Sequence, residues 1–237
     1  GRDSGQADVL WEITPFPFQR GILDRLDAER HRHGRWKNLI VAATGTGKTV
    51  VAALDYQRLR KQFGGDPTLL FVAHRERILS QSRTKFQYAT SDPAFGEILA
   101  GGEKPTRWRH VFANVQSLQN IDLSTIDPKH FDVVIIDEFH HAKAKTYERL
   151  LDHFEPKVLV GLTATPERAD GQDVREWFDG RFAAEIRLWD ALEGQFLVPF
   201  HYFGIHDDVD LSDVTWRRTG YDKSELEQLY TLSLIHI

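Results

Sequence analysis

The stretch Ile40-Val41-Ala42-Ala43-Thr44-Gly45-Thr46-Gly47-Lys48-Thr49 decides the fold of this 237-residue chain. Its apolar start predicts a buried strand, its middle is a turn of small residues, and a helical pattern follows from Lys48 to Phe63. It fits the pattern G-x-x-x-x-G-K-[ST], with Ala42 in place of the first glycine. Glycines at positions 45 and 47 let backbone N–H groups converge on an anion at the helix N-terminus. The stretch therefore predicts a phosphate-binding loop.

In such a loop the lysine, here Lys48, reaches the β- and γ-phosphates, and the hydroxyl of Thr49 binds Mg²⁺. The rest of the phosphate cradle is formed by Thr44, Gly45, Thr46 and Gly47. The alternative is a glycine-rich turn before a helix that happens to carry a lysine, and the flanking strand and helix argue against it. The loop alone predicts a nucleoside triphosphate ligand and does not distinguish kinases, GTPases, transporters and helicases.

A second motif, Asp137-Glu138-Phe139-His140, follows the apolar run Val133-Val134-Ile135-Ile136. In open parallel sheets the carboxyl ends of the strands line the ligand crevice, so we expect Asp137 beside the phosphate loop. Asp137 would hold Mg²⁺, and Glu138 would orient and deprotonate an attacking water. Together with Lys48, these carboxylates are the predicted catalytic residues for hydrolysis of a γ-phosphate.

The rest of the pattern predicts an α/β fold with three layers, in which helices cover both faces of a mostly parallel central sheet. The predicted strands are Asn38–Ala43, Thr68–Ala73, Val111–Ala113, Asp132–Asp137 and Lys157–Leu162. The predicted helices are Phe16–Arg32, Lys48–Phe63 and Arg75–Tyr88.

Beyond Gly180 the pattern weakens. Phe182–Leu188 alternates like an edge strand, Trp189–Phe196 is typical of a helix, and Phe200–Ile205 is typical of a further strand. The polar, turn-rich stretch Asp207–Tyr221 has the composition of a linker. We therefore expect one domain over residues 1–205 and a linker, or the start of a following region, over residues 206–237.

Composition excludes several classes of protein. The chain has no cysteine, which rules out disulfides, thiol catalysis and thiolate zinc sites, and no apolar run approaches the roughly 18 residues of a membrane span. We expect a cytoplasmic protein. The absence of methionine predicts that the sequence is part of a longer protein. The apolar end, residues 231–237, is either translated adaptor sequence or a truncated native strand.

The motifs, in their order along the chain, resemble the first RecA-like domain of superfamily 2 helicases and translocases, the group with DEAD, DEAH and related boxes. Pro17-Phe18-Gln19 resembles the R-P-Y-Q element, and the segment Ala43–Thr49 resembles motif I. Asp137–His140 resembles motif II, and Leu162-Thr163-Ala164-Thr165-Pro166 resembles motif III. Segments similar to motifs Ia and Ib are Val72-Ala73-His74-Arg75 and Ala113–Leu118.

The resemblance implies roles for individual residues, with ATP and Mg²⁺ as cofactors. It implies that Gln19 recognises adenine and that His140 hydrogen-bonds either motif III or Gln19. It implies that the nucleic-acid backbone is contacted by His74, Arg75, Gln116 and Ser117. It also implies that Thr163 and Thr165 couple the state of the nucleotide to the contacts with the strand.

Asp137–Ala142 (D-E-F-H-H-A) and Gly161–Gly171 (G-L-T-A-T-P-E-R-A-D-G) resemble the restriction-type subgroup, and Phe139 argues against an RNA helicase. We therefore expect the ATP-binding domain of a DNA-dependent ATPase that acts as a helicase or translocase. The alternatives are an ATP-dependent restriction translocase subunit and a nucleic-acid-binding module without efficient ATPase activity. Motifs IV to VI are absent, so the resemblance implies a second RecA-like domain in the full-length protein and slow turnover by this chain alone. Whether the strand is DNA or RNA stays open.

Trp108 lies between Arg107 and Arg109, which permits either stacking on a base or packing on its own domain. The histidines at 130, 140, 141 and 153 lack the spacing of a metal site. The net charge of −5 does not by itself indicate a nucleic-acid-binding protein.

Overall fold

The computed structural model describes residues 13–138, 144–164, 174–186, 216–217 and 220–221. Contacts within the chain divide it into two compact units, Gly1–Val198 and Pro199–Ile237. In the second unit the described residues form an antiparallel pair, β8 (Trp216–Arg217) with β9 (Gly220–Tyr221). The boundary near residue 205 stays a prediction, and the predicted helix Trp189–Phe196 and strand Phe200–Ile205 lie outside the described residues.

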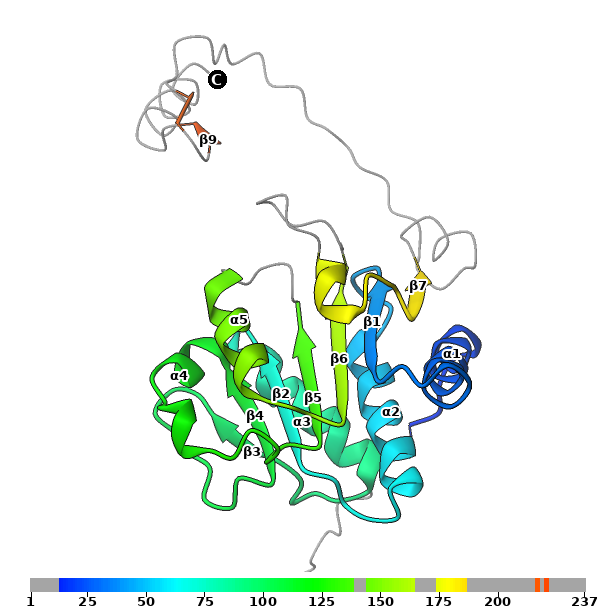
Figure 1. Cartoon of the computed structure of the whole chain (residues 1–237), viewed down its shortest axis with the longest axis horizontal. Helices are drawn as coiled ribbons and strands as arrows, with labels where there is room; N and C mark the ends of the chain where they lie inside the picture. Colours follow the sequence, from blue (N-terminus) through cyan, green and yellow to red (C-terminus); the bar gives the residue numbers. More distant parts are fainter. Residues whose placement is uncertain (1–12, 139–143, 165–173, 187–215, 218–219, 222–237) are drawn as a thin grey trace, which may run out of the picture. The chain divides into compact units, whose positions relative to one another are not determined.

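The first unit is built on a seven-stranded sheet with the strand order β3-β4-β2-β5-β6-β1-β7. Every strand pair in it is parallel, and Figure 1 shows the arrowheads pointing to one edge. The strands are β1 (Lys37–Ala42), β2 (Leu69–Ala73), β3 (Glu97–Leu99), β4 (His110–Asn114), β5 (Val133–Asp137), β6 (Val158–Thr163) and β7 (Ala184–Ile186). The central strands β2, β5 and β6 are buried at every residue, as expected of a parallel sheet covered on both faces.

Successive side chains along the strands point to opposite faces of the sheet and belong to two apolar clusters, one on each face. In β1, Ile40 joins the cluster that also contains residues of α1 (Pro17–His33), α2 (Lys48–Gln62) and α3 (Glu76–Thr90). Leu39 and Val41 join the other cluster, which contains residues of α4 (Val115–Gln119), α5 (Ala144–His153), η1 (Leu123–Thr125) and η3 (Val174–Phe178). The predicted three-layer α/β fold is confirmed.

The predicted strands and helices in the described residues are present, with ends that differ by a few residues. The edge strand expected within Phe182–Leu188 is β7, which pairs with β1. β3, α4 and α5 are not among the predicted elements, and β3 has only three residues. Among the described helices, none is long and apolar enough to cross a membrane.

A buried ion pair joins the first helix to the helix that follows the phosphate loop. Arg30 is 1% exposed, and its guanidinium donates to both carboxylate oxygens of Asp55 at 2.7 and 2.8 Å. Its Nε donates to Oδ1 of Asn38 in β1 at 2.8 Å. Because an unpaired buried charge is costly, these partners fix α1 against α2 and β1.

Replacing Asp55 with Ala would leave the guanidinium of Arg30 buried without its counter-charge. We expect a loss of about 3–5 kcal/mol in the free energy of unfolding, measured by urea denaturation. The matched control is Asp24→Ala, which removes a carboxylate that is 63% exposed and pairs with Arg58 on the surface. The control should change stability by less than about 1 kcal/mol. Equal losses in the two variants would contradict the role of the buried pair.

Candidate functional site

The segment predicted to bind phosphate forms a turn between the end of β1 and the start of α2. Gly45 and Gly47 have φ values of 89° and 79°, in the left-handed region that glycine adopts without strain. The hydroxyl of Thr46 donates to the carbonyl of Ala43 at 2.7 Å and closes the turn. Thr44 and Gly45 are exposed, whereas Thr49 is half-buried in the first turn of α2. The strand, turn and helix that the sequence predicted are therefore in place.

Lys48 lies between the loop and the acidic motif. Its side chain is nearly buried, and its Nζ donates to the carbonyl of Ala42 at 3.0 Å. The same atom lies 3.9 Å from Oε1 of Glu138. Burial lowers the pKa of Lys48, and the negative charges of Glu138 and Asp137 oppose that shift. The fold thus brings together two motifs that are far apart in the sequence.

Asp137 is the last residue of β5, and Glu138 turns the chain away from the sheet. Oδ1 of Asp137 accepts a hydrogen bond from the backbone N–H of Glu138 at 3.0 Å. Glu138 has a φ of 51°, a left-handed conformation that is uncommon outside glycine and is often found at functional sites. Burial, followed by the charge of Glu138, raises the pKa of Asp137 to about 6, and Lys48 counteracts part of this shift.

The oxygen groups at this site suit a small, hard cation. Carboxylate and hydroxyl oxygens are the ligands that Mg²⁺ prefers, usually together with phosphate oxygens and waters. In the part of the chain that the structure describes, no group of three or more His, Cys, Asp or Glu side chains is placed to hold a metal by itself. A cation at Asp137 and Thr49 would therefore complete its coordination with the phosphates it serves.

Thr163 lies between the two motifs. β6 separates β5 from β1 in the sheet: Leu162 pairs with Asp137 on one side, and Thr163 pairs with Val41 on the other. Thr163 is fully buried at the carboxyl end of β6. This position suits the predicted coupling role, which stays a prediction. Thr165 and His140 lie outside the described residues.

Gln19, at the start of α1, is brought to the phosphate loop. Its Oε1 accepts the N–H of Phe16 at 3.0 Å, and its Nε2 donates to the carbonyl of Thr46 at 3.1 Å. A cavity of about 350 Å³ adjoins these residues. Its lining consists of Ile13, Thr14, Phe16, Pro17, Phe18, Gln19, Gly45, Thr46, Gly47 and Val50. A cavity that continues from the phosphate loop has the place expected for the base of a nucleotide.

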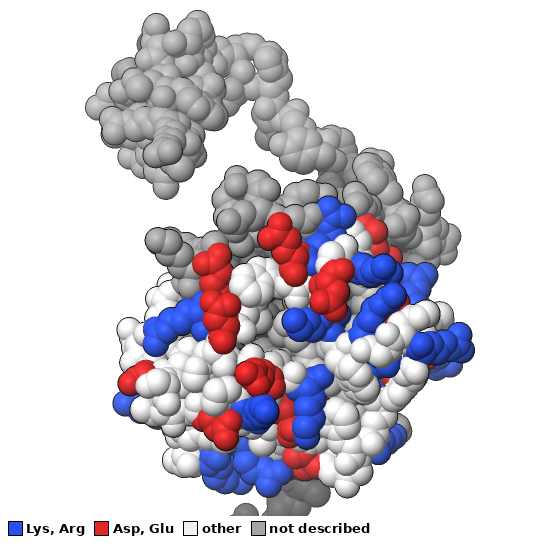
Figure 2. All heavy atoms as spheres, viewed as in Figure 1, with Lys and Arg blue, Asp and Glu red and all other residues white. Residues whose placement is uncertain are grey.

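The four residues assigned to the nucleic-acid backbone lie at the carboxyl ends of two adjacent strands. His74 and Arg75 follow β2, whereas Gln116 and Ser117 lie in α4, directly after β4. His74, Arg75 and Gln116 are exposed, and Ser117 is half-buried. The amide of Asn114 donates to the carbonyl of His74 at 3.0 Å and ties the two segments together, a role that sequence analysis did not assign. On the face drawn in Figure 2, acidic and basic side chains are interspersed.

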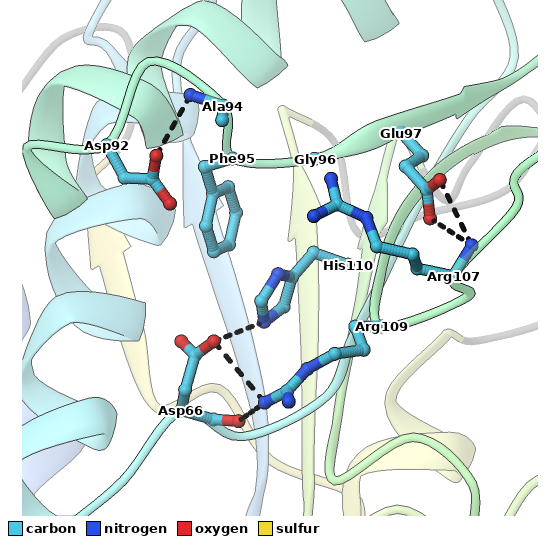
Figure 3. A pocket seen from close by; sticks show the side chains of 9 residues that line it. All are labelled: Asp66, Asp92, Ala94, Phe95, Gly96, Glu97, Arg107, Arg109 and His110. Carbon is cyan, nitrogen blue, oxygen red and sulfur yellow. Dashed lines mark hydrogen bonds and ion pairs between the residues drawn. The ribbon is translucent and has the colours of Figure 1, made fainter.

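The segment around Trp108 lies at the amino end of β4, the opposite end of the strands from the phosphate loop. Partial burial would raise the pKa of Glu97, but hydrogen bonds from Thr106, Arg107 and Trp108 lower it. Figure 3 shows Asp66 facing Arg109 and His110 across a small pocket. Trp108 is half-buried and packs against an apolar cluster. Of the two interpretations, packing on its own domain is the one observed.

Comparison with known proteins identifies the family of the chain. Residues 12–168 match the family model of the type III restriction enzyme res subunit. The chain is similar to the type I restriction enzyme EcoAI endonuclease subunit of Escherichia coli, with 30% identity over 204 residues, 79% of this chain and 23% of the relative. It is similar to the putative ATP-dependent helicase IRC3 of Saccharomyces cerevisiae, with 26% identity, 84% of this chain and 30% of the relative.

A third relative is the DNA 3'-5' translocase XPB2 of Sulfurisphaera tokodaii, with 28% identity, 68% of this chain and 35% of the relative. The chain thus spans only about a quarter to a third of the length of these curated relatives.

Solved structures share the fold at low sequence identity. The type ISP restriction-modification enzyme LlaGI, in complex with a DNA substrate mimic, aligns with a TM-score of 0.63 and 16% identity over 77% of this chain and 21% of that chain. The UvsW helicase of bacteriophage T4 aligns with a TM-score of 0.57 and 16% identity over 74% of this chain and 60% of that chain. With the family model covering more than half of its residues, the chain belongs to the restriction-type (ResIII) family of superfamily 2 and carries its helicase-type ATP-binding domain.

Proposed function

We propose that this chain is the ATP-binding part of a DNA-dependent ATPase that acts as a helicase or translocase. The observation that carries the proposal is the approach of Lys48 Nζ to Glu138 Oε1, at 3.9 Å. This distance supports a site in which Lys48 binds phosphate and Glu138 accepts a proton. The left-handed φ of Glu138, 51°, is a backbone conformation often found at functional sites, which further supports a role for this carboxylate.

In the proposed reaction the loop N–H groups and the Lys48 ammonium bind the β- and γ-phosphates. Thr49 and Asp137 would hold Mg²⁺, and the bound ion would neutralise part of the negative charge of the phosphates. Glu138 accepts the proton of the attacking water. Lys48 is held beforehand by the Ala42 carbonyl, so little reorganisation is needed when phosphate binds.

We assign the exposed segments His74–Arg75 and Gln116–Ser117 to the nucleic-acid backbone. Their adjacent strand ends and the link through Asn114 give a common surface at the same edge of the sheet as the phosphate loop. Backbone contacts position a strand without reading its sequence. DNA is favoured over RNA because XPB2 is a DNA translocase and LlaGI was solved with a DNA substrate mimic.

The second candidate function is that of a translocating subunit in an ATP-dependent restriction enzyme. The match to the res subunit family and the 30% identity to the EcoAI subunit favour it. The two candidates share the ATPase site and differ in the domains that accompany it. A nucleic-acid-binding module without ATPase activity is disfavoured because Lys48, Thr49, Asp137 and Glu138 are all retained.

We further propose that a second RecA-like domain in the full-length protein completes the site. In this superfamily that domain brings an arginine finger, and such fingers contribute roughly 10³- to 10⁵-fold to the rate of hydrolysis. The 237-residue chain should then bind Mg·ATP but turn it over slowly, with or without DNA. Brisk DNA-stimulated turnover by the chain alone would contradict this.

Replacing Lys48 with Ala should lower kcat of the full-length ATPase by on the order of 10²-fold or more, because a donor to the transferred phosphate is lost. Steady-state phosphate release measures this directly. Lys61→Ala is the matched control, since Lys61 is an exposed lysine at the other end of the same helix. Normal turnover in Lys48→Ala would refute the proposed role of the loop.

Replacing Glu138 with Gln keeps the shape of the side chain and removes its ability to accept a proton. Hydrolysis should fall by about 10²- to 10⁴-fold, while the affinity for Mg·ATP should stay within a few-fold of the wild-type value. Single-turnover kinetics and calorimetric titration separate the two quantities. A variant that lost binding and hydrolysis in parallel would argue against Glu138 as the base.

The pKa of Asp137 predicts how stability depends on pH in the metal-free chain. The folded state holds a proton up to about pH 6, whereas the ordinary value is 3.8, so the unfolded state releases this proton first. Raising the pH through this window therefore lowers the free energy of unfolding. In EDTA, Asp137→Asn should be more stable than the wild type at pH 7.5 and equal to it near pH 3.5. A difference that does not change with pH would contradict this assignment.

A further inference from the structure

Aromatic and basic side chains meet at the amino edge of the sheet, the edge away from the arrowheads in Figure 1. The ring of His31 lies edge-on to that of Trp36, with 5.8 Å between the centroids, and Trp36 lies 6.3 Å from Phe63. Nζ of Lys157 lies over the Phe63 ring, 5.8 Å from its centroid. These contacts join the ends of α1 and α2 and the starts of β1 and β6 in one surface.

The two larger rings are held in place by the backbone to which they belong. The carbonyl of Trp36 accepts the N–H of Leu159 in β6 at 2.9 Å, and its side chain packs against an apolar cluster. The N–H of Phe63 donates to the carbonyl of Leu59 at 2.9 Å and closes α2. Phe63 is nevertheless 37% exposed. An exposed ring in a fixed position needs little ordering before it stacks on a planar ligand.

The charges around these rings are positive. The segment Arg30-His31-Arg32-His33-Gly34-Arg35-Trp36-Lys37 contains no carboxylate. Arg32 and Lys37 are exposed, and neither pairs with a carboxylate among the residues that the structure describes. Cations in the last turn of α1 suit the negative end of its dipole. Lys37 is the first residue of β1, so the helix dipole does not account for the whole set.

The carboxylates beside the rings are already paired. Glu29 accepts from Arg35 at 3.0 Å, and Asp132 lies 2.8 Å from the ammonium of Lys157. A surface whose acids are compensated internally, and whose remaining cations flank aromatic rings, is complementary to a chain of negative charges that carries planar groups.

We propose that this amino-edge patch is a second nucleic-acid site, which binds a single strand by stacking bases on its rings and pairing phosphates with its cations. The patch is formed by His31, Arg32, Trp36, Lys37, Phe63 and Lys157. A single strand combines regular negative charge with exposed base faces, whereas a duplex hides those faces and an acidic peptide lacks them. The side chain of Lys157 is 70% exposed, so its ammonium can exchange the face of Phe63 for a phosphate when a base stacks there.

The amino-edge patch is separate from the surface assigned to the nucleic-acid backbone. His74–Arg75 and Gln116–Ser117 follow the carboxyl ends of β2 and β4, whereas Trp36 and Lys37 lie where β1 begins. All strands of the sheet are parallel, so these are opposite edges (Figure 1). A strand held at the amino edge is remote from the phosphate loop. Its binding should therefore need no nucleotide and is independent of the proposed ATPase chemistry.

The test measures binding of a fluorescein-labelled oligo(dT) strand of about 15 bases to the nucleotide-free chain by fluorescence anisotropy. All variants carry Arg75→Ala, which weakens the surface at the carboxyl edge. Adding Phe63→Ala should weaken binding of the strand by roughly 5-fold or more, because a base loses its stacking partner, and should leave binding of a duplex unchanged. Phe63→Trp should retain the affinity. Phe16→Ala removes another exposed phenylalanine, at the start of α1, and is the matched control that should change nothing.

The cations of the patch are tested through the salt dependence of the same binding. Arg32→Gln combined with Lys37→Gln should reduce the slope of log K against log salt by about 1.4, since each phosphate contact on a single strand contributes about 0.7. Lys104→Gln removes an exposed lysine between β3 and β4, on the other side of the sheet, and should leave the slope unchanged. Thermal unfolding of each variant checks that it is folded.

Photocrosslinking locates the strand on the wild-type chain and does not depend on any variant being folded. On irradiation, iododeoxyuridine in the oligo(dT) strand attaches to an aromatic ring on which it stacks, and mass spectrometry of the digested chain identifies the residue. Crosslinks are expected at Trp36 or Phe63, with and without Mg·ATP.

Each of the following results would overturn the proposal: no binding of the strand, unchanged or duplex-like behaviour in folded Phe63→Ala, an unchanged slope in the double variant, or crosslinks confined to other residues. Displacement of the strand by poly-glutamate as readily as by unlabelled oligo(dT) would also overturn it, because the patch would then suit an acidic protein equally well. None of these results bears on the ATPase site, whose assignment fails instead if Lys48→Ala hydrolyses ATP normally.

Discussion

The position of Lys48 is the constraint on which the site depends, because one ammonium group serves two motifs. Its Nζ is held by the Ala42 carbonyl on one side and faces Glu138 on the other. Lys48 can face Glu138 only if β1 and β5 lie at a fixed distance from each other. The strand between them, β6, sets that distance. The spacing in turn needs strands that are buried on both faces, which is why the apolar runs of this chain are nearly continuous. The chemistry of the site is thus tied to the packing of the sheet.

The first helix is fixed to the phosphate loop and to the helix after it by two polar contacts. Arg30 holds the C-terminal half of α1 against Asp55 in α2, while Gln19 holds its N-terminal end against Thr46 in the loop. Two polar anchors, both nearly buried, therefore fix α1, whose first turn lines the cavity beside the loop, relative to that loop.

Electrostatics at the acidic motif follow from the same burial. Asp137 is nearly buried beside Glu138, so its carboxyl keeps its proton to a higher pH than usual unless a cation is near. Lys48 offsets only part of this cost. On the proposed function, Mg²⁺ would relieve the repulsion between the two carboxylates, and we therefore expect a metal-bound nucleotide to bind better than a free one.

The sequence by itself determined the chemistry and the fold class. Glycines at 45 and 47, the lysine that follows, and the carboxylates after an apolar run are local patterns whose physical meaning does not depend on distant residues. Hydrophobic periodicity likewise predicted the strands that form the centre of the sheet. β3 was not predicted because its three residues, Glu97-Ile98-Leu99, are too few to show the alternation of a strand.

Only the tertiary structure decided which side chains face one another. Trp108 between two arginines suited base stacking as well as packing, and its place at the amino end of β4 settled the matter for packing. The amide of Gln19 accepts the N–H of Phe16 in a local contact three residues apart, but its donation to the Thr46 carbonyl, 27 residues away, is one that no linear pattern encodes. Residue types and their spacing limit the chemistry a chain can perform, but the direction of a side chain is set by long-range contacts, and these exist only once the sheet and its helices have packed.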